Sequence, residues 1–208
     1  MSDTSLVLYS FPLSGNAHRA ELALALMGLE YENRTVKLGE GEHRGEEFKK
    51  LNPASQVPVL VDGDTVVTES TAILTYLAAK FDDGTFMPSD AAGQAEVQKW
   101  FAKANGPLQN RPAAARLITL FGAQFDQAAT IEKAHAFLAY LNAELADKEF
   151  LVAGRPTLAD VAIYSYVAHA PEGLVELTDY TNVTSWLTRI EALEGFAGMQ
   201  KTDVSSAA

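Results

Sequence analysis

The chain has 208 residues, of which 48% are hydrophobic and 21% are charged, and its formal net charge is −11 at pH 7. This composition is that of a folded globular protein and excludes a disordered chain, and an acidic chain without a basic patch argues against a nucleic-acid partner. No apolar run reaches the length of about 18 residues that a membrane span needs, and the absence of cysteine excludes disulfides and any thiol of the protein itself.

The first 82 residues alternate between strand and helix patterns. In chain order we expect a strand at Leu6–Ser10, a helix that begins at Asn16 and that Gly28 ends, and a strand at Tyr31–Leu38. A weak short helix at Glu46–Leu51, strands at Val57–Val61 and Thr65–Thr68, and a helix at Ser70–Phe81 follow. The Asp62-Gly63 step between the last two strands is a strong hairpin signal. This order predicts an α/β domain with a mixed four-stranded sheet.

Residues 83–91 are rich in turn formers and are predicted to be a linker. Residues 92–208 show only helical periodicity, interrupted at Gly106-Pro107 and at Gly154-Arg155-Pro156. The expected helices are Ala92–Asn105, Pro112–Phe121, Gln127–Leu145, Leu158–Ala168 and Asn182–Leu193. The second half is therefore predicted to be an all-α bundle.

Ser14, Gly15 and Asn16 lie between the first strand and the first helix. A helix N-terminus presents unpaired N–H groups and a partial positive charge, which stabilise a thiolate bound there. A hydroxyl that donates a hydrogen bond to the sulfur lowers the thiol pKa further. Taken alone, Ser14 is more often just an N-cap, so the pattern is compatible with both roles.

Gln56, Val57 and Pro58 lead into the third strand. A proline at the start of a strand has no N–H to donate and often marks a cis peptide bond, which we predict for Val57–Pro58. The N–H and C=O of Val57 would then point outward and could pair with an extended peptide. A turn proline without a binding role explains the pattern equally well.

Glu69 and Ser70 stand at the start of the helix Ser70–Phe81. The Ser70 hydroxyl and the helix N–H groups suit a carboxylate, and Glu69 suits an ammonium group. Together they fit the head group of an α-amino acid, although a helix cap with an acidic neighbour is also common. The four histidines show no metal-ligand spacing, and no metal site is predicted.

Taken in order, four motifs resemble the glutathione transferase family over essentially the whole chain. They are Ser14-Gly15-Asn16, Leu51 to Leu60 (LNPASQVPVL), Thr68 to Ile73 (TESTAI) and Gly154 to Asp160 (GRPTLAD). The resemblance implies a thioredoxin-like glutathione-binding domain over residues 1–82, and an all-helical domain over residues 92–208 that contributes the second-substrate pocket. It also implies glutathione as co-substrate and a homodimer. Because the chain lacks cysteine and the start MSDTSLVLYS lacks a secretory pattern, we expect a cytoplasmic protein.

In this family a Tyr, Ser or Cys near the start of the first helix activates the thiol. The resemblance implies a serine-type member in which Ser14 is the first candidate, the Asn16 amide the second and Tyr9 the third. These three residues are the catalytic candidates.

The same resemblance implies contacts along the rest of the tripeptide. Val57, flanked by Gln56 and Pro58, would bind the cysteinyl backbone, while Glu69 and Ser70 would hold the γ-glutamyl end. His43 or Lys37 would reach the glycine carboxylate.

This set of residues predicts a glutathione transferase that joins the thiol to a small hydrophobic electrophile. The alternatives are a glutathione-dependent peroxidase, isomerase or lyase on the same scaffold, or a non-catalytic glutathione-binding protein. The lack of cysteine argues against a disulfide mechanism that uses a thiol of the protein.

Overall fold

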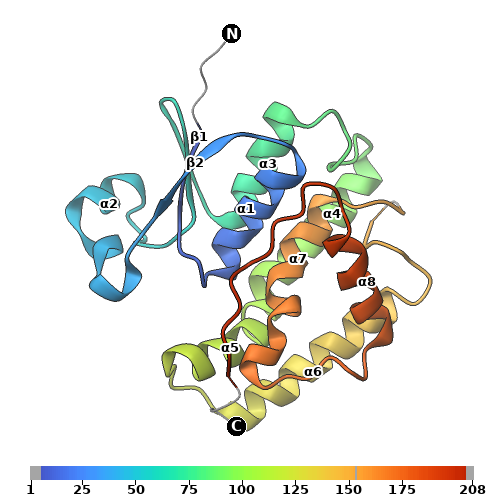
Figure 1. Cartoon of the computed structure of the whole chain (residues 1–208). Helices are drawn as coiled ribbons and strands as arrows, with labels where there is room; N and C mark the ends of the chain where they lie inside the picture. The colour runs from blue at the N-terminus through green and yellow to red at the C-terminus, as the bar shows by residue number, and fades with distance from the viewer. Residues whose placement is uncertain (1–5, 153, 205–208) are drawn as a thin grey trace. The chain divides into compact units, whose positions relative to one another are not determined.

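The structure is a computed structural model that describes residues 6–152 and 154–204 (Figure 1). It divides into two compact units. Unit 1 contains the described residues up to Asp83 together with Glu194–Gln200, and unit 2 contains Gly84–Leu193 together with the described residues from Lys201 onward. The first five residues, on which the expectation of no secretory pattern partly rests, lie outside the described residues.

Unit 1 is built on a four-stranded sheet with the strand order β2-β1-β3-β4. The strands are β1 (Leu6–Ser10), β2 (Tyr31–Thr35), β3 (Val59–Asp62) and β4 (Thr65–Thr68). β1 runs parallel to β2 and antiparallel to β3, and β3 and β4 form the hairpin expected at Asp62-Gly63. The mixed four-stranded sheet predicted from the sequence is confirmed.

Helices pack against both faces of this sheet. They are α1 (Gly15–Leu26), α2 (Glu46–Leu51) and α3 (Ser70–Phe81), with 3-10 turns η1 (Leu38–Glu40) and η2 (Glu42–Arg44) before α2. Phe48 of α2 packs with Val36 and Val59 on one face of the sheet. Because side chains alternate along a strand, the fully buried Leu8 and Leu60 point to the other face, where α1 and α3 lie against each other (Figure 1).

Two predicted strands are shifted in the structure because β1 sets their register. β2 ends at Thr35 instead of Leu38, since its partner strand β1 ends at Ser10 before Pro12. β3 begins at Val59 instead of Val57, because Pro58 has no N–H for the ladder and Val59 is the residue paired with Tyr9.

Unit 2 is all-helical within its described residues, as predicted. Its helices are α4 (Ala91–Lys103), α5 (Pro112–Phe121), α6 (Gln127–Glu144), α7 (Leu158–Ala168) and α8 (Thr181–Glu191), with a π-helix η3 (Ala104–Leu108) and a 3-10 turn η4 (Ala170–Gly173). The expected interruption at Gly106-Pro107 is wrong, since η3 continues α4 through Pro107. The wider π turn accommodates a residue that cannot donate to the α-helical ladder. No helix among the described residues is long and apolar enough to cross a membrane.

α7 is buried on all sides and is fixed by a capping box at its N-terminus. The Asp160 carboxylate is buried and accepts four hydrogen bonds: from the Thr157 N–H at 2.8 Å, the Thr157 hydroxyl at 3.0 Å, the Leu151 N–H at 2.9 Å and the Trp186 indole at 2.9 Å. Asp160 thus ties the start of α7 to the preceding loop and to α8.

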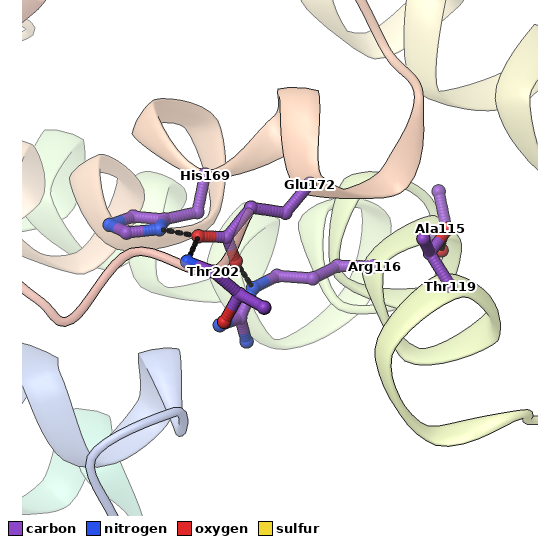
Figure 2. A network of polar contacts seen from close by, with 6 residues as sticks. All are labelled: Ala115, Arg116, Thr119, His169, Glu172 and Thr202. Atoms are coloured by element: carbon purple, nitrogen blue, oxygen red, sulfur yellow. Dashed lines mark hydrogen bonds and ion pairs between the residues drawn. The ribbon is translucent and has the colours of Figure 1, made fainter. Parts of the chain in front are cut away.

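A buried polar network joins α5, η4 and the segment that follows α8 (Figure 2). The Glu172 carboxylate accepts from the Arg116 guanidinium, from His169 Nδ1 at 2.9 Å and from the Thr202 N–H at 2.8 Å. Only 2% of the Arg116 side chain and 8% of the Glu172 side chain are exposed. η4 approaches α5 so closely that a Cβ at Gly173 would lie 2.6 Å from the backbone N of Arg116, and only glycine fits there.

The segment Glu194–Gln200 packs in unit 1, although it follows the last helix of unit 2 in the sequence. The carbonyl of Ala197 lies 2.8 Å from His18 Nε2 on α1. Gly195 has φ +79°, and a Cβ there would lie 2.7 Å from the carbonyl oxygen of Ala25. Both the backbone conformation and the close approach therefore require glycine at this position.

Candidate functional site

Ser14 is the N-cap of α1. Its backbone is extended (φ −90°, ψ 108°), and its hydroxyl oxygen accepts from the Ala17 N–H at 3.2 Å. The oxygen thus satisfies one of the first N–H groups of the helix, and the hydroxyl proton points elsewhere. A serine in this geometry caps the helix as an acceptor and can donate to a ligand at the same time.

Asn16 and Ser70 are connected through a buried arginine. Arg19 Nη1 donates to Asn16 Oδ1 at 2.7 Å and to the Ser70 hydroxyl at 3.1 Å. Asn16 belongs to the first turn of α1, and Ser70 is the first residue of α3. The two helix N-termini are therefore joined by one side chain that is itself fully buried.

Tyr9 belongs to a different environment from Ser14 and Asn16. Its ring packs against the cluster of Val36, Phe48 and Val59, in an edge-on contact with Phe48 at 6.2 Å between ring centres. Its hydroxyl accepts from Arg34 Nη1 at 2.8 Å. This side chain is thus part of the face of the sheet that α2 covers.

The N-terminus of α3 carries an unusual backbone conformation. Glu69, in the N-cap position, has φ +68°, a value that residues other than glycine rarely adopt. Its side chain is exposed, whereas Ser70 is 6% exposed. Such conformations persist where the surrounding structure holds them, and they occur preferentially at functional sites.

The Val57–Pro58 peptide bond is cis, as predicted. Val57 is half-buried against the Phe48 cluster, and its backbone lies outside the β3 ladder, which begins at Val59. Gln56 is exposed, and its carbonyl accepts from the Asn52 side chain at 2.8 Å. The hydrogen bond between Asn52 and Gln56 thus stabilises the turn before β3.

His43 and Lys37 lie in the irregular segment before α2. His43 is in η2 and half-buried, and its Nδ1 is buried with no hydrogen-bond partner among the described residues. Lys37 is exposed and forms an ion pair with Glu40 at 3.3 Å. In the described part of the chain, no three or more His, Asp or Glu side chains gather in a way that could hold a metal ion.

Arg19 is the residue of this site that the sequence analysis missed. It stands inside a helix whose neighbouring residues are largely apolar and buried, and charged residues are almost never fully buried unless they are paired. A single charge on the buried face of an apolar helix was the available signal. Its partner Ser70 is 51 residues away in the sequence, so only the fold identifies it.

Two family models match this chain. The glutathione S-transferase N-terminal domain matches residues 4–79, and the glutathione S-transferase C-terminal domain matches residues 113–194. Together they span most of the sequence, so the assignment does not depend on one short motif.

Individual relatives agree with these models. "Glutathione S-transferase 1" of Dianthus caryophyllus is 51% identical over 83 residues, which is 40% of this chain and 38% of that protein. This match therefore covers only about two fifths of the length of that relative. "Maleylpyruvate isomerase" of a Ralstonia species is 35% identical over 184 residues, which is 83% of this chain and 86% of that protein.

Among solved structures, a glutathione transferase homologue from Drosophila mojavensis with bound glutathione has a TM-score of 0.84. It is 26% identical, and the match covers 91% of this chain and 89% of that chain. The thioredoxin-like domain, the helical domain and the two family models lead to one assignment: this chain belongs to the glutathione transferase family, whose co-substrate is glutathione.

Proposed function

We propose that this chain lowers the pKa of the thiol of bound glutathione and transfers the thiolate to a small hydrophobic electrophile. The observation that carries the proposal is the geometry of Ser14 at the N-terminus of α1.

Ser14 is the proposed thiol-activating residue. Its oxygen accepts from the Ala17 N–H, which leaves its proton to donate to a sulfur bound at the N-terminus of the helix. That N-terminus adds a partial positive charge, and α1 carries no acidic side chain in its first turn to oppose it. Both effects favour the thiolate over the thiol.

Asn16 and Tyr9 are weaker candidates than Ser14 for donating a hydrogen bond to the sulfur. The Asn16 amide is in the same turn and can donate through Nδ2, but Arg19 holds its Oδ1 and so fixes the direction of its N–H groups, whereas the Ser14 hydroxyl can rotate toward the sulfur. The Tyr9 hydroxyl faces Arg34 and its ring packs on the α2 side of the sheet. We therefore assign Asn16 a supporting role and Tyr9 a structural one.

The remaining contacts follow the length of the tripeptide. We assign the γ-glutamyl carboxylate to the Ser70 hydroxyl and the first N–H groups of α3, and the ammonium group to the exposed Glu69 carboxylate. The backbone of Val57 would pair with the cysteinyl backbone. We assign the glycine carboxylate to His43, whose Nε2 can donate a hydrogen bond when it carries the ring proton.

The electrophile is assigned to unit 2, and the protein is proposed to act as a cytoplasmic homodimer. These assignments rest on membership of the family. Light scattering tests the dimer, and a single species near the chain mass of 22.4 kDa at micromolar concentration would contradict it.

The Ser14→Ala variant tests the thiol-activating role. A hydrogen bond to a charged group contributes about 1.5–3 kcal/mol, so its loss raises the pKa of the bound thiol by about one to two units. Glutathione binding should stay nearly unchanged, while turnover with a chlorodinitrobenzene falls about tenfold or more near neutral pH and recovers at alkaline pH.

Ser10→Ala is the matched control. Ser10 is the last residue of β1, four residues before Ser14, and its hydroxyl donates to Asn33 of β2. It should leave the pH–rate profile unchanged. A Ser14→Ala deficit that is constant with pH would reduce Ser14 to a cap. With no deficit at all, the role would pass to Asn16, and Asn16→Ala would be the next variant.

A second candidate function is isomerisation of a conjugated cis double bond. It is favoured by the similarity to "Maleylpyruvate isomerase", which extends over 83% of this chain. A thiolate that adds to such a bond converts it to a single bond that can rotate, and elimination then restores the thiol. Incubation with maleylpyruvate and catalytic amounts of glutathione distinguishes the two activities, because transfer consumes glutathione and isomerisation does not.

A further inference from the structure

We propose that Arg19 is a positioning residue that fixes the hydrogen-bond polarity of Asn16 and Ser70, so that both present donors to the anionic groups of bound glutathione. The inference rests on the proposed function and adds to it a residue that acts on the thiol and on the γ-glutamyl carboxylate only through Asn16 and Ser70. Its basis is the pair of contacts that Arg19 makes between α1 and α3.

The Arg19 side chain is unusual because it is fully buried within a helix-packed core. Its neighbours Ala17, Ala20 and Leu22 are also fully buried. Taking a guanidinium out of water is unfavourable unless hydrogen bonds compensate. Breaking the hydrogen bonds of Arg19 to Asn16 and Ser70 would therefore cost much free energy. A rigid, always charged side chain at this position is suited to orient weaker neighbours.

Arg19 determines which atom of the Asn16 amide can face a ligand. A guanidinium has only donors, so the amide atom 2.7 Å from Nη1 must be the oxygen. The amide nitrogen, with two N–H donors, is then on the opposite edge. An amide that could otherwise present either edge is thereby restricted to a donor, which suits a thiolate and not a thiol proton.

The same argument applies to Ser70. Its oxygen accepts from Arg19 Nη1 at 3.1 Å, so the hydroxyl proton is directed away from the guanidinium. Ser70 is the first residue of α3, where the helix N–H groups also point outward. Hydroxyl and backbone donors then face one anion together, as a carboxylate requires.

The test measures the thiol and the γ-glutamyl carboxylate of the ligand separately. Arg19→Met removes the charge and the donors, and Arg19→Gln keeps hydrogen bonding but can present an acceptor. The pKa of the bound thiol is read from thiolate absorbance against pH. The contact between Ser70 and the γ-glutamyl carboxylate is read from the calorimetric affinity for S-methylglutathione, which has no thiol.

We expect Arg19→Met and Arg19→Gln to raise the pKa of the bound thiol by about one unit and to weaken S-methylglutathione binding about tenfold. Arg19→Lys, which is also charged and donor-only, should restore more than half of both effects. In an Asn16→Ala background, Arg19→Gln should change the thiol pKa by less than half as much, while its effect on S-methylglutathione persists. A merely structural role would not divide the two readouts in this way.

Lys50→Gln is the control, since it removes one positive charge from an exposed position on α2. It should change neither readout. If Arg19→Met does not fold, as judged by circular dichroism, Arg19→Gln carries the test. Wild-type values in Arg19→Gln, or an Arg19→Lys variant no better than Arg19→Gln, would overturn the inference. If the wild-type chain binds no glutathione, the proposed function itself fails, which is a different outcome.

Discussion

Replacement of Glu172 by glutamine tests whether the buried network of Figure 2 stabilises unit 2. The substitution keeps the size of the side chain and removes its charge. The Glu172 carboxylate accepts from three donors, of which Arg116 is charged and buried. A glutamine amide can replace at most part of this set, and its NH₂ group would face donors.

The structure allows the size of the effect to be estimated. Removing one partner of a buried ion pair costs about 3–5 kcal/mol. The amide oxygen of glutamine retains one or two of the contacts, so we expect a loss near the lower limit, about 3 kcal/mol. For a chain of this size each kcal/mol shifts Tm by about 2–4 °C, so Tm should fall by about 6–12 °C.

Tryptophan fluorescence is the appropriate assay, because Trp100 and Trp186, the only tryptophans of the chain, both lie in unit 2. Urea unfolding followed at this signal gives the unfolding free energy of that unit. Glu176→Gln is the matched control, since Glu176 is exposed and only four residues away. It should shift stability by less than about 0.5 kcal/mol.

A loss below about 1 kcal/mol in Glu172→Gln would refute the reasoning. So would an Arg116→Met/Glu172→Gln double variant that is no more stable than Glu172→Gln, because removing the second charge should recover much of the loss. The coupling between the two sites is the quantity that the structure predicts.

The same network gives stability a pH dependence. Burial lowers the pKa of His169 although Glu172 raises it, so the unfolded chain takes up a proton that the folded unit resists as pH falls through about 6.5. Burial opposes ionisation of Glu172, but Thr202, His169 and Arg116 outweigh it and lower the pKa of Glu172. The stability from Glu172 is therefore present above about pH 4.3 and is lost at lower pH, and Glu172→Gln should lack this second decline.

Three further substitutions address other parts of the fold. Asp160→Asn removes a carboxylate with four hydrogen bonds and should lower the unfolding free energy of unit 2 by about 2–4 kcal/mol in the fluorescence assay. Burial opposes ionisation of Asp62, but the Lys80 ammonium and a tyrosine hydroxyl lower its pKa, so Asp62→Asn should flatten the loss of stability that the wild type shows below about pH 4 in circular dichroism. Gly195→Ala introduces a Cβ 2.7 Å from the Ala25 carbonyl at φ +79°, and amide hydrogen exchange over residues 194–200 should become faster.

Each of these three has a result that would count against it. Asp160→Asn at wild-type stability would make the capping box dispensable, and an unchanged acid limb in Asp62→Asn would assign acid unfolding to other groups. Gly39→Ala is the control for Gly195, since a Cβ at Gly39 meets nothing within 4 Å. Equal exchange in the two variants would show that Gly195 carries no constraint.

Much of the fold could be predicted because local signals determine it. The bounds of α2, β4 and α3 agree with the predicted ranges. The hairpin turn at Asp62-Gly63 and the amphipathic pattern of Ser70–Phe81 delimit β4 and α3, whereas the pattern of α2 was weak. The ends of β2 and β3 could not be predicted in the same way. They depend on where β1 ends and on which residue faces Tyr9, and both are properties of pairing between strands.

The candidate site was predictable only in part, for a similar reason. Ser14, Glu69 and Ser70 mark helix starts that the sequence itself shows. The role of Arg19 depends on its hydrogen bond to Ser70, and the role of Arg116 depends on its contact with Glu172, 56 residues away. Contacts of this range depend on how helices pack, and no spacing within one segment encodes them.

The segment Glu194–Gln200 makes unit 1 discontinuous along the chain, with a consequence for synthesis. Proteins emerge from the ribosome N-terminus first, and domains commonly fold as they emerge. Unit 1 cannot acquire its contact between His18 and Ala197 until residues 84–193 of unit 2 have been translated. Unit 1, whose first residues are translated before those of unit 2, is therefore completed only after the helices of unit 2 have been made, and a nascent chain stalled before residue 194 would carry unit 1 unfinished.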